Sequence, residues 1–362
     1  MNAVNTMDYV TTEKGKVNNM ESAMQYRTMM SMAPRNGATM NLGREKLPWS
    51  QEIWNRIDQA VHDECERTKI ARKFIPLYGP VAPGELIVIS DTVVRENGQA
   101  LTVNESSTIA LVELQVEFTL TLQQVHREGE LMTAVTLATR SANLLSQAED
   151  VVIFQGQSAI DGIGGVQHPL FADNKVRVRS GPAGDGLVKA AEANPIQVIQ
   201  VTAFEPDDPT DPNEPRRFGE RTFAAVADGY SRLQSGNGLQ QAHYGPYALA
   251  LHNEPYADTY APLATTLIMP ADRIKPLVTA GFYGTGTLPA TGATPNVRET
   301  TGVLVSLGGN TMDLVVAVDA ITAFLQEDTE GRYRFRVYER FALRLKDTSS
   351  VIKFEFGSGL SK

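Results

Sequence analysis

Three arginines near the C-terminal end of the chain are spaced two residues apart: Arg332, Arg334 and Arg336. Apolar residues alternate with them, as in a half-buried β-strand, so the three guanidinium groups are expected to share one face. Such a face suits an anion, a nucleic acid or the acidic surface of a neighbouring subunit. It is also the pattern of an ordinary solvated strand face, and both interpretations stay open.

Other candidate chemistries lack a required partner. The glycine-rich segment 281–286 has no Lys-Ser or Lys-Thr and no following helix, so we predict a loop rather than a phosphate site. Tyr283 in this loop is a candidate for a subunit contact. Segment 156–160 lacks the second glycine of a nucleophile elbow. Glu149 and Asp150 are adjacent on a predicted helix and point in different directions, so they are not a matched acid/base pair. We predict no catalytic residue and no enzyme.

Metal and cofactor sites are not predicted either. The five histidines show no zinc-like spacing, and the single cysteine excludes an intrachain disulfide and a multi-cysteine metal site. Cys65 falls on the apolar stripe of a predicted helix, which indicates a buried thiol. The acidic segment 207–214 could attract calcium weakly, but it lacks the ligand spacing of an EF-hand. A solvated loop is the favoured interpretation there.

The overall charge bears on possible partners. The formal net charge is −9, which argues against a dedicated nucleic-acid binder but not against a wall that surrounds nucleic acid. No apolar run reaches membrane-spanning length, and the N-terminal sequence is not that of a secretory signal. We expect a protein that works without a membrane, inside the cell or released in a particle after lysis.

The first half of the chain predicts an arm, a helix and a hairpin. Residues 1–46 are polar and rich in methionine, and we expect this arm to lie against a neighbouring subunit. Ser50 can cap a helix that runs to about Lys73. A short strand is predicted at 74–78, and residues 84–108 read as a long hairpin. Its turn provides three further candidates for subunit contacts, namely Glu96, Asn97 and Gly98.

The rest of the chain predicts a long helix and many strands. Residues 112–120 alternate strictly, which predicts a strand with one buried and one wet face. A helix of over twenty residues follows, from about 131 to 154, and Gly156 closes it. Residues 157–300 are turn-rich, with a buried strand at 245–251, and the C-terminal part is β-rich. Helices and strands do not alternate regularly, so the fold class is α+β.

Five sequence blocks, in this order, resemble the encapsulins, which are linocin-like shell proteins. They are residues 54–58 with Gly79-Pro80, residues 112–120 with 149–156, the glycine turn 162–165, the Gly-Pro-Tyr-Ala-Leu strand at 245–249, and residues 302–309 with Asp319. The fold of this family is that of tailed-phage major capsid proteins, the Hong Kong 97 type. The resemblance therefore implies an α+β capsid fold with a peripheral domain, an axial domain, an extended loop and an N-terminal arm.

The resemblance also implies domain boundaries. Residues 1–46 would be the arm, 47–83 the N-terminal helix and strand, and 84–108 the extended loop. Residues 109–165 and 302–362 would form the peripheral domain with its long spine helix. Residues 166–301 would form the axial domain with an insertion. The extended loop holds no lysine, so the Lys–Asn crosslink of some relatives is not expected.

The arm and the long middle region exceed what encapsulins usually carry. We therefore favour a tailed-phage major capsid protein in the virion, assembled in the host cytoplasm around DNA that is bound without sequence specificity. The alternative is an encapsulin-type compartment in the bacterial cytoplasm that encloses a cargo protein, and a soluble enzyme is a distant third. In either shell the main partner is the chain itself, in pentamers and, in a larger lattice, hexamers. Portal, scaffolding and decoration proteins are further partners of a viral shell.

Overall fold

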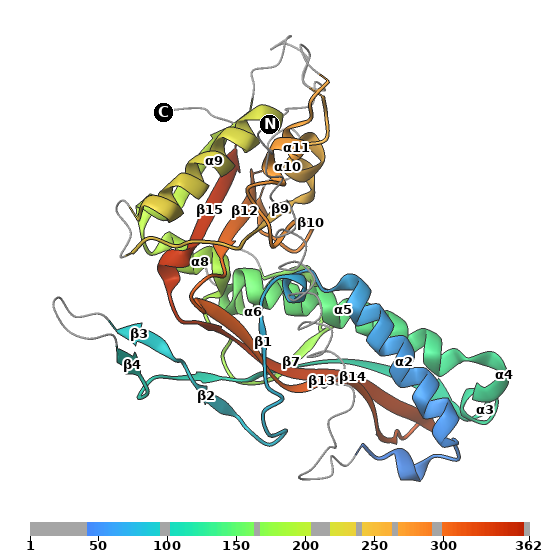
Figure 1. Ribbon diagram of the computed structural model, residues 1–362. Coiled ribbons are helices and arrows are strands. Elements are labelled where there is room, and N and C mark those ends of the chain that lie inside the picture. The colour runs from blue at the N-terminus through green and yellow to red at the C-terminus, as the bar shows by residue number, and fades with distance from the viewer. Residues whose placement is uncertain are drawn as a thin grey trace, which may run out of the picture. The chain divides into compact units, whose positions relative to one another are not determined.

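The computed structural model describes residues 42–94, 102–162, 167–203, 218–236, 241–262, 267–291 and 299–357 (Figure 1). Most of the predicted arm, the acidic segment 207–214 and the hairpin turn with Glu96, Asn97 and Gly98 lie outside these residues. The predictions made for them remain predictions. Residues from Asn41 onward belong to one compact unit.

A five-stranded sheet forms the first layer. Its strands, in spatial order, are β1 (Leu77–Tyr78), β13 (Met312–Glu327), β14 (Arg332–Leu345), β6 (Val112–Thr121) and β7 (Arg177–Ser180). The neighbours β13, β14 and β6 are antiparallel. Alternating apolar residues place Leu114, Val116 and Phe335 on one face, where they are buried. That face is covered by helices.

Two long helices make this cover, α2 (Gln51–Thr68) and α5 (Thr133–Gln155), which pack on each other and on the sheet (Figure 1). On α2, the predicted apolar stripe is buried through Ile57, Val61 and Cys65. The predicted long helix is confirmed as α5, and Gly156 is its C-cap. Its buried face is rich in alanine, which lets the helix approach the sheet closely.

A second sheet carries the remaining core strands. They are β10 (Gly281–Thr285), β9 (Tyr247–His252), β12 (Glu299–Ser306), β15 (Val351–Gly357) and β8 (Val198–Thr202), with β11 (Ala290–Thr291) paired to β12. Helix α9 (Gly219–Ser235) packs on β8, β12 and β15. Every residue of β9 is buried, which confirms the buried strand predicted there. The C-terminal segment 302–362 thus supplies strands to both sheets, and the predicted division into peripheral and axial domains stays a prediction.

Four short strands build the predicted hairpin. They are β2 (Ile87–Ile89), β3 (Thr92–Val94), β4 (Thr102–Asn104) and β5 (Thr108–Ala110). β2 pairs with β5 and β3 pairs with β4, both antiparallel, so the hairpin consists of two successive ladders (Figure 1).

Short helices fill the connections. The α-helices are α3 (Leu122–His126), α4 (Glu128–Leu131), α6 (Gln157–Asp161), α7 (Pro169–Ala172), α8 (Gly186–Glu192), α10 (Asn253–Asp258) and α11 (Pro270–Ile274), and the 3-10 helices are η1 (Arg44–Lys46), η2 (Ala71–Lys73), η3 (Pro195–Gln197) and η5 (Thr348–Ser350). Over the described ranges, no helix combines the length and apolar character needed to cross a bilayer. The mixture of elements confirms the α+β class.

Three predictions about the bounds or type of an element are wrong. The strand predicted at 74–78 is limited to Leu77–Tyr78. The first helix ends at Thr68 rather than near Lys73, because the residues after it turn inward to bind buried carboxylates. The glycine-rich segment predicted as a loop is the strand β10. It forms because its backbone pairs in parallel with β9, a long-range contact that local sequence does not reveal.

Candidate assembly surface

The hairpin exposes apolar side chains instead of burying them. Leu86 is 60% exposed and Ile87 is 55% exposed, and Ile89 and Val103 are also exposed. The exposed apolar side chains of this two-stranded hairpin are not buried by their own chain, so they add no hydrophobic stabilisation to it. A two-stranded hairpin of this kind is marginally stable alone. This is the surface expected of an element that another chain covers.

A group of buried charges anchors the root of the hairpin to the first sheet. Arg344 on β14 donates two hydrogen bonds to Asp313 on β13, both at 2.7 Å. The ammonium group of Lys346 lies 2.8 Å from the same carboxylate. The hydrogen bond with Asp313 raises the pKa of Arg344 above its ordinary value. Arg344 also donates to the carbonyl oxygen of Ile89, so this group ties the hairpin to the first sheet.

The predicted arginine face exists on β14, but its members already bind carboxylates of the same chain. Arg334 forms an ion pair with Glu117 on β6. Arg177 on β7 reaches the same carboxylate at 2.9 Å. Arg332 pairs with Glu330 in the turn before β14. These side chains stay partly exposed, and their role in a subunit contact stays a prediction.

One face of β6 was predicted to be wet, and for its first half this is wrong. Glu113 and Gln115 are buried, at 6% and 1% exposure. Arg336 donates to both, at 3.2 and 3.0 Å. Arg340 also pairs with Glu113 and donates to the carbonyl oxygen of Pro83 at the hairpin root. The polar residues are buried because the arginines of the neighbouring strand and the hairpin root cover them.

Tyr283 does not lie on a loop but in β10, where it is half buried. Its ring stacks on Phe74 with centroids 5.7 Å apart, and its hydroxyl group donates to the carbonyl oxygen of Ala280 at 3.4 Å. Burial raises the pKa of this phenol. The residue links the second sheet to the segment after α2, and its predicted subunit contact remains a prediction.

The strongest electrostatic feature was not predicted as a cluster. Lys69, just after α2, forms ion pairs with Glu149 on α5 and Glu339 on β14, and all three side chains are buried. Arg72 donates to Glu149 at 2.6 Å and to Asp319 on β13 at 2.8 Å. These contacts tie α2 to the spine helix and to two strands. The conspicuous signal in the sequence was Glu149 next to Asp150 in an otherwise apolar helix.

Burial and charge set the protonation of this cluster. Burial would lower the pKa of Lys69, but Glu149 and Glu339 outweigh it and raise that pKa. Burial raises the pKa of Glu339 to about 8, and the charge of Glu149 adds to the shift. Burial would also raise the pKa of Glu149, but Arg72 and Lys69 lower it to about 2. Burial and the charge of Glu149 therefore favour the protonated form of Glu339.

Asp150 binds backbone groups, whereas the adjacent Glu149 binds charged side chains. Its carboxylate accepts hydrogen bonds from the backbone N–H groups of Ile70, at 2.9 Å, and Ala71, at 2.9 Å. Burial raises its pKa to about 7 against the effect of these two donors. The two adjacent acids therefore bind different partners, and together they position the segment after α2 rather than perform acid/base chemistry.

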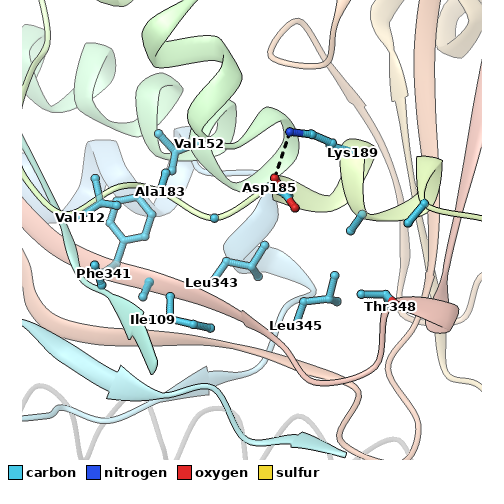
Figure 2. A pocket seen from close by; sticks show the side chains of 16 residues that line it. Ile109, Val112, Val152, Ala183, Asp185, Lys189, Phe341, Leu343, Leu345 and Thr348 are labelled. Carbon is cyan, nitrogen blue, oxygen red and sulfur yellow. Dashed lines mark ion pairs between the residues drawn. The ribbon is translucent and has the colours of Figure 1, made fainter. Parts of the chain in front are cut away.

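A cavity of about 270 Å³ lies between the end of α5, α8 and β14 (Figure 2). Apolar side chains such as Val152, Phe341 and Leu343 point into it. The charged pair beside it is Lys189 with Asp185, at 3.2 Å. Within the ranges that the structure describes, no three His, Cys, Asp or Glu side chains are placed to hold a metal ion.

Comparisons with known proteins agree with this geometry. The family described as "Encapsulating protein for peroxidase" matches residues 39–191 and 210–342. The chain is 24% identical over 334 residues to the type 1 encapsulin shell protein EncA of Myxococcus xanthus, covering 89% of this chain and 98% of the relative. It is 21% identical over 318 residues to a diheme-cytochrome-encapsulin shell fusion protein of Kuenenia stuttgartiensis, covering 84% and 73%.

A solved structure supports the fold. The crystal structure of a virus-like particle from Pyrococcus furiosus aligns with a TM-score of 0.54 at 13% identity, over 84% of this chain and 99% of that chain. The chain is thus a shell protein with the Hong Kong 97 capsid-type fold. It belongs to the encapsulin family. The prediction of a tailed-phage capsid protein is not confirmed, and the alternative agrees better with these findings.

Proposed function

We propose that this chain is the shell subunit of an encapsulin-type compartment that encloses a cargo protein in the bacterial cytoplasm. The observation that carries the proposal is the length of the match to an encapsulin shell protein, which spans 98% of that relative. The family match resumes at residue 210 after a gap from 192 to 209. The length of the middle region favoured a viral capsid protein, but most of this region lies within the part that matches the family.

The geometry supports a subunit whose task is association. The hairpin presents exposed Leu86, Ile87 and Val103 away from the core. Arg340 and Arg344 on β14 donate to the carbonyl oxygens of Pro83 and Ile89, which ties the base of the hairpin to the first sheet. Identical contacts of this kind, repeated around an axis, close into rings and shells. Each contact can be weak because many act at once.

The contents of the particle test the proposal. Particles purified from the source cells are treated with nuclease and protease, and their contents are identified by mass spectrometry and nucleic-acid extraction. Closed shells with a protease-protected second polypeptide are the expected result. Protected DNA of genome length would instead establish a viral capsid. Closed shells without any protected polypeptide would contradict the proposed enclosure of a cargo protein. Small soluble subunits without shells would contradict the proposed assembly function.

A further inference from the structure

The hairpin has a joint between its two ladders. The β2–β5 ladder ends at the pair Ile89 and Thr108, and the β3–β4 ladder begins at Thr92 and Asn104. Between these two pairs, residues 90–91 of one strand face residues 105–107 of the other. None of these five residues belongs to a ladder pair. An unequal count of this kind bends a strand pair and loosens its direction. The angle of the outer ladder is thus not set by ladder hydrogen bonds.

Asp91 occupies this joint in an unfavourable conformation. Its φ is +60°, in the left-handed region that residues with a Cβ atom rarely adopt. Its neighbour Ser90 is buried and donates from its backbone to the carbonyl oxygen of Ser107 at 2.8 Å. Aspartate adopts this conformation more readily than most residues with a Cβ atom, so its position depends on the partners of its carboxylate.

The partners of Asp91 are buried charged residues beside the joint. Arg344 and Lys346 bring two positive charges, whereas Asp313 brings one negative charge, and all three are buried. One buried cation would therefore lack a counter-charge, which is costly in a protein interior. The carboxylate of Asp91 lies 3.6 Å from Arg344 and 3.6 Å from Lys346. It supplies the missing negative charge from the hairpin.

The same two basic residues touch the hairpin backbone on both sides of the joint. Arg344 donates to the carbonyl oxygen of Ile89 at 3.4 Å, before the joint. The backbone N–H of Val93, after the joint, donates to the carbonyl oxygen of Lys346 at 3.3 Å. Arg344 and Lys346 thus fix the position of the joint relative to the first sheet.

We propose that Asp91 is an electrostatic latch that fixes the angle of the outer ladder β3–β4 and so decides where the hairpin reaches a second copy of the chain. The inference rests on the proposed shell function, since the angle has a consequence only where copies associate. With the latch closed, all copies present the hairpin at one angle and close one kind of shell. With the latch open, the outer ladder pivots at the joint and the contact geometry varies.

The central variant is Asp91→Asn. Asparagine tolerates the left-handed conformation well, so this change removes the charge and keeps the backbone. Glu105→Gln is the matched control, because it removes one carboxylate from the exposed part of the same hairpin, outside the buried group. Asp91→Glu keeps the charge and tests whether the charge rather than the residue is required.

The hairpin angle is measured directly by the distance between spin labels on Val103→Cys and Glu130→Cys, both at exposed positions. Cys65 is buried and burial raises its thiol pKa to about 11, so it does not compete for the label. Shells contain few labelled copies among unlabelled ones, so that each distance is internal to one subunit. The parent protein, the control and Asp91→Glu are expected to give one narrow distance peak. Asp91→Asn is expected to lose it, and its shells are expected to lose their uniform diameter in electron micrographs.

The outcomes separate the latch from the proposed function. If the parent chain forms no shells, the shell function fails, and the distance peak in free subunits still tests the latch. If Asp91→Asn keeps the narrow peak and the shell diameter of the parent chain, the latch is overturned. Loss of the peak in Asp91→Glu as well would also overturn it, because charge would not be the cause. If Asp91→Asn does not fold, loss of the parent peak in concentrated salt supports the latch, and an unchanged peak refutes it.

Discussion

The protonation of Glu339 follows from the charges that surround it. Lys69 and Arg72 contribute two positive charges to the cluster after α2, whereas Glu149, Glu339 and Asp319 offer three carboxylates. Asp319 is exposed, whereas Glu149 and Glu339 are both buried, so burial and the charge of Glu149 disfavour the ionised form of Glu339. One side-chain oxygen of Glu339 has no hydrogen-bond partner among the described residues. The pKa of the Glu339 carboxyl group is raised to about 8.

Glu339→Gln is predicted to make the stability of the protein less sensitive to pH between about 4.5 and 8. The pKa of Glu339 is higher in the folded chain than in the unfolded chain, where it is near 4.5. Its contribution to stability is therefore full below pH 4.5 and is lost between about pH 4.5 and pH 8, by at most about 1.4 kcal/mol for each pH unit, with no further loss above pH 8. Glutamine imitates the neutral acid and removes this loss. The check is the thermal midpoint of the assembled protein at pH 5 and pH 8.

The control for this experiment is Glu327→Gln, which removes an exposed carboxylate at the end of β13. It should keep the pH profile of the parent protein. Equal losses of stability between pH 5 and pH 8 in Glu339→Gln and in the parent would show that Glu339 is already ionised in the folded chain.

Asp150→Ala is predicted to loosen the segment after α2. The substitution leaves the buried N–H groups of Ile70 and Ala71 without their acceptor. Each such loss costs about 1–3 kcal/mol. Hydrogen exchange of residues 69–73 should accelerate more than exchange in the rest of α2. Asp150→Asn keeps a carbonyl acceptor and should show a smaller effect, and equal effects of the two variants would contradict this explanation.

Among the elements, those with strong internal periodicity were predictable and those defined by distant partners were not. The helix α5 and the strand β9 follow from apolar spacing and from a glycine at the helix end. The end of α2 was misplaced because Lys69 leaves the helix to reach carboxylates eighty or more residues away. The strand β10 was missed because glycines usually weaken a strand, and here the neighbouring β9 imposes the extended conformation.

The end of the spine helix depends on a close approach of two backbones. Gly156 has a φ of +68°, and a Cβ atom there would overlap the backbone of Gly184 and Asp185. We predict that Gly156→Ala destabilises the subunit by more than about 3 kcal/mol, through overlap and backbone strain together. Soluble yield and the thermal midpoint are the measurements. Gly84→Ala is the control, because space is open around Gly84. Equal behaviour of the two variants would exclude the close approach as a constraint.

For the whole molecule, the order of sequence blocks predicted the capsid-type fold, but the kind of shell was not fixed by it. The contacts that distinguish shells lie between chains, and the chemistry of one chain leaves them undetermined. The exposed apolar residues of the hairpin, such as Leu86 and Ile87, show this limit. In the sequence they are part of a strand pattern, and only their exposure marks them as a surface for a partner.

The point where the chain enters the compact unit is firmly held. The carbonyl oxygen of Leu42 accepts a hydrogen bond from the backbone of Phe324 at 2.9 Å. Arg44 binds Asp58 on α2 through two hydrogen bonds, at 2.6 and 2.8 Å. Trp49 is buried and donates to the carbonyl oxygen of Val125 at 2.8 Å. The described chain from residue 42 onward is therefore part of the subunit core.

Deletion of residues 1–40 is predicted to leave the subunit folded and to weaken the shell. The anchors at Leu42, Arg44 and Trp49 all remain, so the circular dichroism spectrum should not change. If the arm lies on a neighbouring subunit, its removal takes away contact area in every subunit pair, and the shell should dissociate at a lower temperature. Deletion of residues 1–50 removes the anchors as well and should impair folding itself. Shells of normal diameter and unchanged heat resistance after deletion of 1–40 would show that the arm makes no contribution to association.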